Sequence, residues 1–135
     1  MAEDFKLLSG TWVQASLIRR DLVEALQPYV LDAVITAPNH AFLGALVWLS
    51  SPLDEPVRAG LAAKLARFNG ARQGSADTIA RLLVLKEPPS ALSGEITDKR
   101  SINQRLVMER RATHLARLYA EPLDAEVILP CAAKP

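Results

Sequence analysis

The sequence Ala-Phe-Leu-Gly-Ala-Leu-Val-Trp-Leu, residues 41–49, is the longest apolar run in the chain and determines the predicted fold. A continuous apolar run of this length is expected for a β-strand that is covered on both faces. Residues 29–36, Tyr-Val-Leu-Asp-Ala-Val-Ile-Thr, are rich in branched and aromatic side chains and also favour a strand. Because Pro38-Asn39-His40 lies between the two runs, the sequence predicts an antiparallel hairpin.

Two segments beside this hairpin carry apolar residues at helical spacing. The first is predicted to begin with Ser16 as its N-cap and to end before Pro28, which cannot continue a helix. The second is predicted to begin near Asp54 and to end at Asn69-Gly70. The predicted buried faces are Ile18, Leu22 and Leu26 in the first helix, and Val57, Leu61, Leu65 and Phe68 in the second.

The remaining segments complete an α+β fold. Residues 4–13 predict a short hairpin turned at Ser9-Gly10, and residues 79–85 a third main strand. Ser101 and Gln104 form the sequence pattern of a capping box at the start of a helix predicted to reach about residue 120. Its predicted apolar positions are Ile102, Leu106, Met108, Leu115 and Leu118. We expect residues 1–135 to form a single domain, a small sheet of about three main strands flanked by helices, with 121–135 as a tail.

The composition excludes several classes of protein. Sixteen basic and fifteen acidic side chains leave a net charge of +1, so nucleic acid and membrane surfaces are not the expected partners of the chain as a whole. A single cysteine excludes an intramolecular disulfide and a cysteine-rich zinc site. The nine-residue run is too short for a membrane-spanning helix, which needs about 20 residues. The acidic N-terminus does not match a signal peptide, so we expect a cytoplasmic protein.

Few residues form a recognisable catalytic set. Cys131 lies in the tail, and the two histidines, His40 and His114, are far apart and have no metal-ligand spacing. No nucleophile elbow, phosphate-binding loop or dinucleotide-binding glycine motif occurs. We therefore expect neither a self-contained active site nor a metal site in this chain.

The most informative segment is residues 92–105, Leu-Ser-Gly-Glu-Ile-Thr-Asp-Lys-Arg-Ser-Ile-Asn-Gln-Arg. A turn-rich loop there ends in Lys99 and Arg100, directly before the predicted N-terminus of a helix. Fixed positive charge beside the positive end of a helix is an arrangement that binds anions. The residues alone, however, favour a solvated basic loop followed by an ordinary helix cap over an anion-binding site.

The run from Gly94 to Arg111 resembles the C-terminal lysine-loop motif of feruloyl-CoA synthetases, which are adenylate-forming acyl-CoA ligases. Glu3–Val13 is similar to the hairpin that follows the hinge in this family, and Leu22–Ile35 to the helix and strand after it. Arg81–Pro89 resembles the strand that leads into the lysine loop, so the resemblance extends over about residues 2–120. Arg100 stands where the feruloyl-type loop has glycine.

The resemblance implies a part of an enzyme, namely the C-terminal lid that follows a large N-terminal domain for ATP and the carboxylic acid. By position, Lys99 is the lysine of the adenylation step, with Arg100 as the neighbour that could carry this charge instead. Ser9, Gly10, Thr11 and Trp12 belong to the hairpin that lines the coenzyme A channel in the thioester step. ATP and CoA are the implied cofactors, Mg²⁺ is expected on the missing domain, and no tightly bound cofactor is expected on this chain.

Two interpretations remain open at the level of sequence. The chain is either a ligase lid that is inactive alone, or a stand-alone α+β binding or interaction module without ligase activity. The start close to the family's hinge favours a segment excised from a longer protein over a short natural gene. The acyl substrate and the oligomeric state are not encoded in any motif of the chain.

Overall fold

Three strands form the central sheet of the computed structural model, in the order β3-β4-β5. The structure describes residues 5–6, 12–13, 15–36, 43–50, 52–72, 78–87, 92, 94–96, 104–120 and 124–130. Strand β3 (Val30–Thr36) pairs antiparallel with β4 (Leu43–Leu49), which confirms the predicted hairpin. Strand β5 (Ile79–Val84) pairs with β4 in parallel. The predicted α+β class is therefore confirmed.

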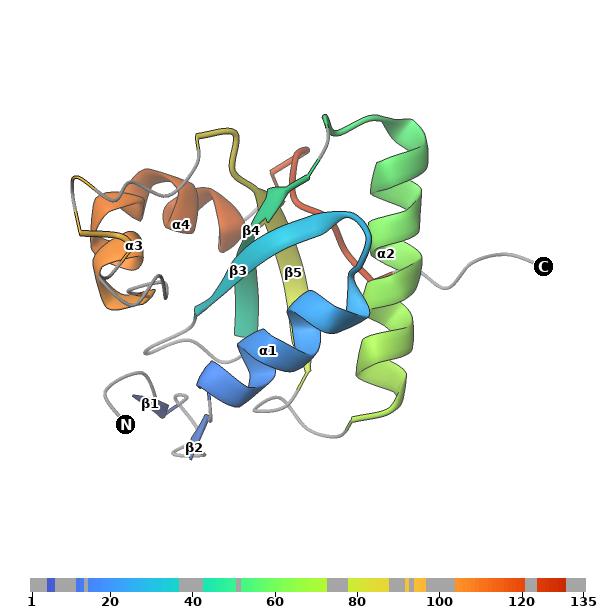
Figure 1. The fold of residues 1–135 in the computed structure, drawn as a ribbon, viewed down its shortest axis with the longest axis horizontal. Coiled ribbons are helices and arrows are strands. Elements are labelled where there is room, and N and C mark those ends of the chain that lie inside the picture. The colour runs from blue at the N-terminus through green and yellow to red at the C-terminus, as the bar shows by residue number, and fades with distance from the viewer. Residues whose placement is uncertain are drawn as a thin grey trace.

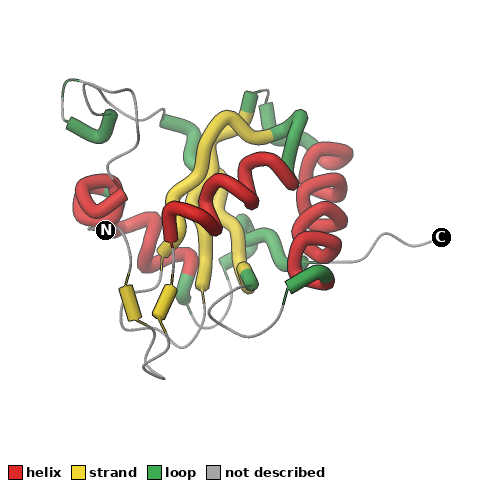
Figure 2. Tube along the Cα trace, turned by 60° about the horizontal axis from the view of Figure 1, so that its bottom comes forward, coloured by secondary structure: helices red, strands yellow, loops and turns green. Residues whose placement is uncertain are grey.

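Helices cover both faces of this sheet (Figures 1 and 2). Helices α1 (Ala15–Ala25) and α2 (Glu55–Gly70) lie on one face, and α3 (Gln104–Arg110) and α4 (Ala112–Leu118) on the other. Because α2 connects two parallel neighbouring strands, β4, α2 and β5 form a β-α-β unit. The two-residue strands β1 (Phe5–Lys6) and β2 (Trp12–Val13) pair antiparallel, as the predicted N-terminal hairpin requires.

Strand β4 is buried along almost its whole length, because alternate side chains enter two different hydrophobic cores. The first core lies between the sheet and the α1–α2 layer, and the second between the sheet and the α3–α4 layer. From β4 the first core receives Leu43, Ala45 and Val47, and the second receives Leu46 and Trp48. The prediction of a strand covered on both faces holds for residues 43–48, whereas Ala41 and Phe42 lie outside the described residues.

The two predicted helical faces of the first layer are buried as expected. Ile18, Leu22 and Leu26 join the first core, as do Leu61, Leu65 and Phe68 of α2, with Val57 packed against it. Asp54 caps α2, since its carboxylate accepts a hydrogen bond from the Val57 amide at 3.0 Å. The predicted cap of α1 is wrong: the helix begins at Ala15, so Ser16 lies inside its first turn.

The predicted continuous helix to residue 120 is wrong in one respect, since the structure divides it at Arg111. The backbone of Arg111 has φ −107° and ψ 31°, away from helical values. Helical hydrogen bonding continues on both sides, from the Arg111 amide to Val107 O (2.8 Å) and from the Leu115 amide to Arg111 O (2.9 Å). The break is thus confined to one residue, whose side chain turns into the protein, and the predicted capping serine, Ser101, lies outside the described residues.

Helix α4 contacts β4 closely at Gly44. A Cβ atom on Gly44 would lie 2.7 Å from Leu118 Cδ2 and 3.3 Å from the hydroxyl of Tyr119. That hydroxyl is 2.9 Å from the hydroxyl of Thr36, and burial raises the pKa of Tyr119 to about 12. Only glycine leaves room for this approach, so Gly44 sets the distance between β4 and α4.

No helix in the described part of the chain is long and apolar enough to cross a bilayer.

We predict that Gly44→Ala lowers the free energy of unfolding by about 1–3 kcal/mol, because the added Cβ would overlap Leu118, which is fully buried and would have to shift within the core. The matched control is Gly70→Ala, where an added Cβ meets no atom within 4 Å and should be neutral or slightly stabilising. Urea unfolding of the two variants measures the difference. Equal stabilities would show that α4 does not pack against β4 as described.

Candidate functional site

Most of the site residues predicted from sequence lie outside the described residues. These are Lys99 and Arg100 of the loop and Ser9, Gly10 and Thr11 of the hairpin. Trp12 is described in its backbone only, where it pairs with Lys6 in the β1–β2 ladder. The site is therefore built from the described residues that precede and follow the Lys99 segment.

A tight turn begins this segment. Gly94 has φ +84°, a conformation that L side chains rarely adopt, and an added Cβ would lie 3.2 Å from Leu106 Cδ2 of α3. Ile96, two residues later, packs against the second core. Residues 94–96 therefore lie directly against α3, at the start of the segment that carries Lys99.

Glu95, between these two residues, has a fully buried side chain. Its carboxylate accepts two hydrogen bonds from Arg111, from Nε to Oε2 and from Nη2 to Oε1, both at 3.1 Å. Arg110 Nε lies 3.5 Å from the same Oε2. A two-pronged arginine–carboxylate pair fixes orientation as well as distance.

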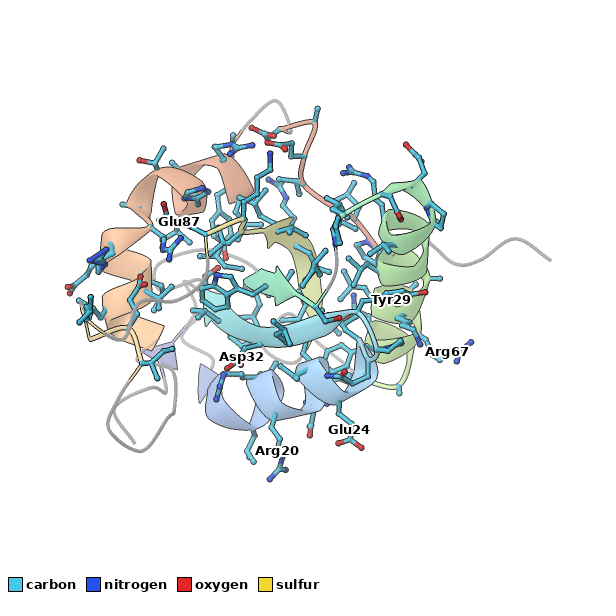
Figure 3. The ribbon with its side chains drawn as sticks, turned by 45° about the horizontal axis from the view of Figure 1, so that its top comes forward. Arg20, Glu24, Tyr29, Asp32, Arg67 and Glu87 are labelled. Carbon is cyan, nitrogen blue, oxygen red and sulfur yellow. The ribbon has the colours of Figure 1, made fainter. Side chains whose placement is uncertain are left out.

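Arg111 also contacts the segment that follows β5. Its Nη1 donates to the carbonyl oxygen of Glu87 at 3.2 Å, and the indole Nε1 of Trp48 donates to the same oxygen at 2.7 Å. The guanidinium carbon lies 6.0 Å from the centre of the Trp48 ring, within the range of a cation–π contact. Figure 3 shows Glu87 on the side of the sheet that α3 and α4 cover.

We call Trp48, Glu87, Glu95 and Arg111 the loop anchor. It joins β4, the segment after β5, the Gly94 turn and the junction of α3 and α4. The sequence resemblance contains Glu95 and Arg111 but gave them no role. The available signal was an acid between Gly94 and an apolar Ile96, within a stretch whose other charges are mainly basic.

Two adjoining hollows lie near the end of β5, with volumes of about 500 Å³ and 420 Å³. Val84, Lys86 and Glu126 line both of them, and His114 and Arg117 line the smaller one. Arg117 donates to Asp124 at 3.1 Å and also pairs with Glu126, and the first of these bonds holds the pKa of Asp124 below its usual value. Its charge is thus engaged by two carboxylates, and within the described ranges no group of three His, Cys, Asp or Glu side chains forms a metal site.

Comparison with known proteins supports the fold. No family model matches the sequence, and no curated protein matches it. Among solved structures, the A domain of carboxylic acid reductase from Segniliparus rugosus, in complex with AMP and a co-purified carboxylic acid, contains a region of the same fold, with a TM-score of 0.71. The match covers 90% of this chain at 21% identity, but only 20% of the reductase chain.

A second solved structure is less similar. Unliganded O-succinylbenzoate coenzyme A synthetase from Bacillus subtilis matches 89% of this chain at 12% identity, with a TM-score of 0.48, and 20% of its own chain is covered. The chain thus spans about one fifth of each of these two proteins.

We predict that Arg111→Met lowers the free energy of unfolding by about 3 kcal/mol or more. The substitution keeps much of the side-chain volume but leaves the buried Glu95 carboxylate without its two hydrogen bonds from Arg111. The control is Arg20→Met, since Arg20 is exposed on α1 and points away from the sheet in Figure 3. Denaturant unfolding of both variants tests the prediction, and a similar small loss in each would contradict it.

Proposed function

We propose that this chain is the C-terminal lid domain of an ATP-dependent acyl- or aryl-CoA synthetase of the feruloyl-CoA synthetase type. The observation that carries the proposal is the fold match to the A domain of carboxylic acid reductase, which was solved with AMP and a carboxylic acid. The match extends over 90% of this chain and a fifth of that one. The lysine-loop resemblance of residues 94–111 supports it independently. The catalysed reaction joins a carboxylic acid to coenzyme A at the expense of ATP.

In the first step, an oxygen of the substrate carboxylate attacks the α-phosphorus of ATP, and pyrophosphate leaves with the bonding electrons. Negative charge grows on the phosphoryl oxygens as this happens. The ammonium group of Lys99 neutralises that charge, which is the role we assign to it; an ion of fixed position is most effective in such a site. Mg²⁺ and most contacts to ATP belong to the large domain.

In the second step, the sulfur of coenzyme A attacks the acyl carbon of the acyl-adenylate and AMP leaves. The lid presents its other face in this step, so that the hairpin of Ser9, Gly10, Thr11 and Trp12 lines the path of the thiol. The two roles are assigned to segments that lie 87 to 90 residues apart in sequence. Since the ATP and acid sites belong to the large domain, the lid alone catalyses neither step.

The decisive experiment adds this chain to the large domain, on the same polypeptide or as a separate one, and follows ATP–pyrophosphate exchange with carboxylic acids, aromatic acids first. Exchange that requires both parts supports the ligase lid. Exchange that is equally fast without this chain favours the alternative, a binding or interaction module that shares the lid fold.

Lys99→Ala should slow acyl-adenylate formation by roughly 100- to 1000-fold, the scale of losing one preorganised charge-stabilising group. Conversion of preformed acyl-adenylate and CoA to the thioester should stay within about twofold of the parent, because the hairpin face serves that step. The two half-reactions are measured separately in the complete enzyme. Arg100→Ala is the matched comparison, and a larger loss in that variant would move the role from Lys99 to Arg100.

A further inference from the structure

Glu95 is a buried charge that the proposed reaction does not use. Its side chain has no exposed surface, and burying a carboxylate is costly unless it is paired and hydrogen-bonded. Well-packed apolar residues often stabilise a fold as well as a buried ion pair does. What an arginine–carboxylate fork adds is a single geometry, with the plane of one group fixed against the plane of the other.

We propose that the Glu95–Arg111 pair positions the Lys99 segment for adenylation, an inference that rests on the function proposed above. Glu95 precedes Lys99 by four residues, a distance of at most about 14 Å along an extended chain. Glu95 lies before the segment, and α3 begins after it at Gln104. Arg111, which follows the last residue of α3, binds Glu95 and so ties the residues before the segment to the helix after it. Glu95 and Arg111 are positioning residues, since both act through Lys99.

The loop anchor is connected to the central sheet. Arg111 donates to the carbonyl oxygen of Glu87, which lies shortly after β5, and Trp48 of β4 donates to that oxygen as well. Trp48 belongs to the second core, so the position of Glu95 is set relative to the central sheet and not only to a neighbouring loop. Placing a catalytic group to within about 1 Å can be worth a hundredfold in rate.

The pair Arg19–Asp32 provides a matched control. It is also two-pronged, since Arg19 donates from Nε to Oδ1 of Asp32 at 3.0 Å and from Nη2 to Oδ2 at 2.8 Å, and it joins α1 to β3. Figure 3 shows Asp32 beside α1, whereas Glu87 lies toward α4. Asp32→Asn therefore removes the charge of a similar pair outside the loop anchor.

The experiment measures both half-reactions in the complete enzyme carrying Glu95→Gln, Arg111→Lys or Asp32→Asn. Glutamine keeps the shape of glutamate but presents an NH₂ group to one of the arginine donors, and lysine lacks the fork. Glu95→Gln and Arg111→Lys should each lower kcat for adenylation roughly 10- to 100-fold and change the thioester step less than twofold. Asp32→Asn should leave both steps within twofold of the parent.

Two further measurements separate positioning from a loss of stability. In the double variant Lys99→Ala/Glu95→Gln, adenylation should be no slower than in Lys99→Ala alone. Glu95 acts only through Lys99, so its loss cannot lower the rate further once the ammonium group is absent. In the 135-residue chain, amide hydrogen exchange over residues 92–106 should be faster in Glu95→Gln than in Asp32→Asn. If Glu95→Gln does not fold, Arg111→Lys takes its place in both measurements.

The possible failures are distinguishable. If Lys99→Ala slows adenylation but the anchor variants slow neither half-reaction, or slow both equally, the positioning role is wrong and the proposed function stands. If Lys99→Ala has no effect on adenylation, the assigned role of Lys99 is wrong and the positioning role falls with it. Unchanged exchange over residues 92–106 in Glu95→Gln would also overturn the positioning role.

Discussion

The burial of β4 on both faces is the constraint on which the rest of the structure depends. A strand whose alternate side chains are all apolar needs a cover on each side of the sheet. The chain supplies the first cover with α1 and α2, which precede and follow the β3–β4 hairpin. Because α2 is the connection between β4 and β5, it also makes that pair parallel. Among the described residues, the second face is covered by elements that follow β5.

This second cover explains why the loop anchor lies where it does. After β5 the chain must leave the sheet and return over it as α3 and α4. The second core is smaller than the first within the described residues, so apolar burial alone fixes this layer less firmly. The Trp48–Glu87–Arg111 contacts join the departure point of the chain to the junction of the two returning helices.

The sequence predicted what depends on local pattern and missed what depends on contacts between distant residues. The run 41–49 is recognisable because a two-sided strand needs continuous apolar residues, and Asp54 because a cap acts within three residues. The burial of Arg111 could not be predicted, because an arginine in a basic helical stretch is typical of a solvent-exposed face. Its partner Glu95 is 16 residues away, and helical periodicity cannot reveal a pair across a turn. A helix between two strands is compatible with parallel pairing, as found for β4 and β5. The sequence analysis did not predict the direction of β5, because the apolar pattern of a strand is the same in either direction.

The two layers differ in chemistry in a way that fits their separate tasks. The α1–α2 layer meets the sheet mainly through apolar side chains, and its Arg19–Asp32 pair stays partly exposed to solvent. Apolar packing tolerates volume-conserving substitutions at modest cost. The α3–α4 layer adds a buried arginine and a buried glutamate, whose hydrogen bonds are satisfied in one arrangement and whose separation is expensive. An apolar contact in their place could fill the same space but would not fix the orientation of the Gly94 turn against α3 in the way that an arginine–carboxylate fork does. We therefore infer that the free energy lost by burying these two charges is offset by a specific result, which is a single register between the Gly94 turn and α3.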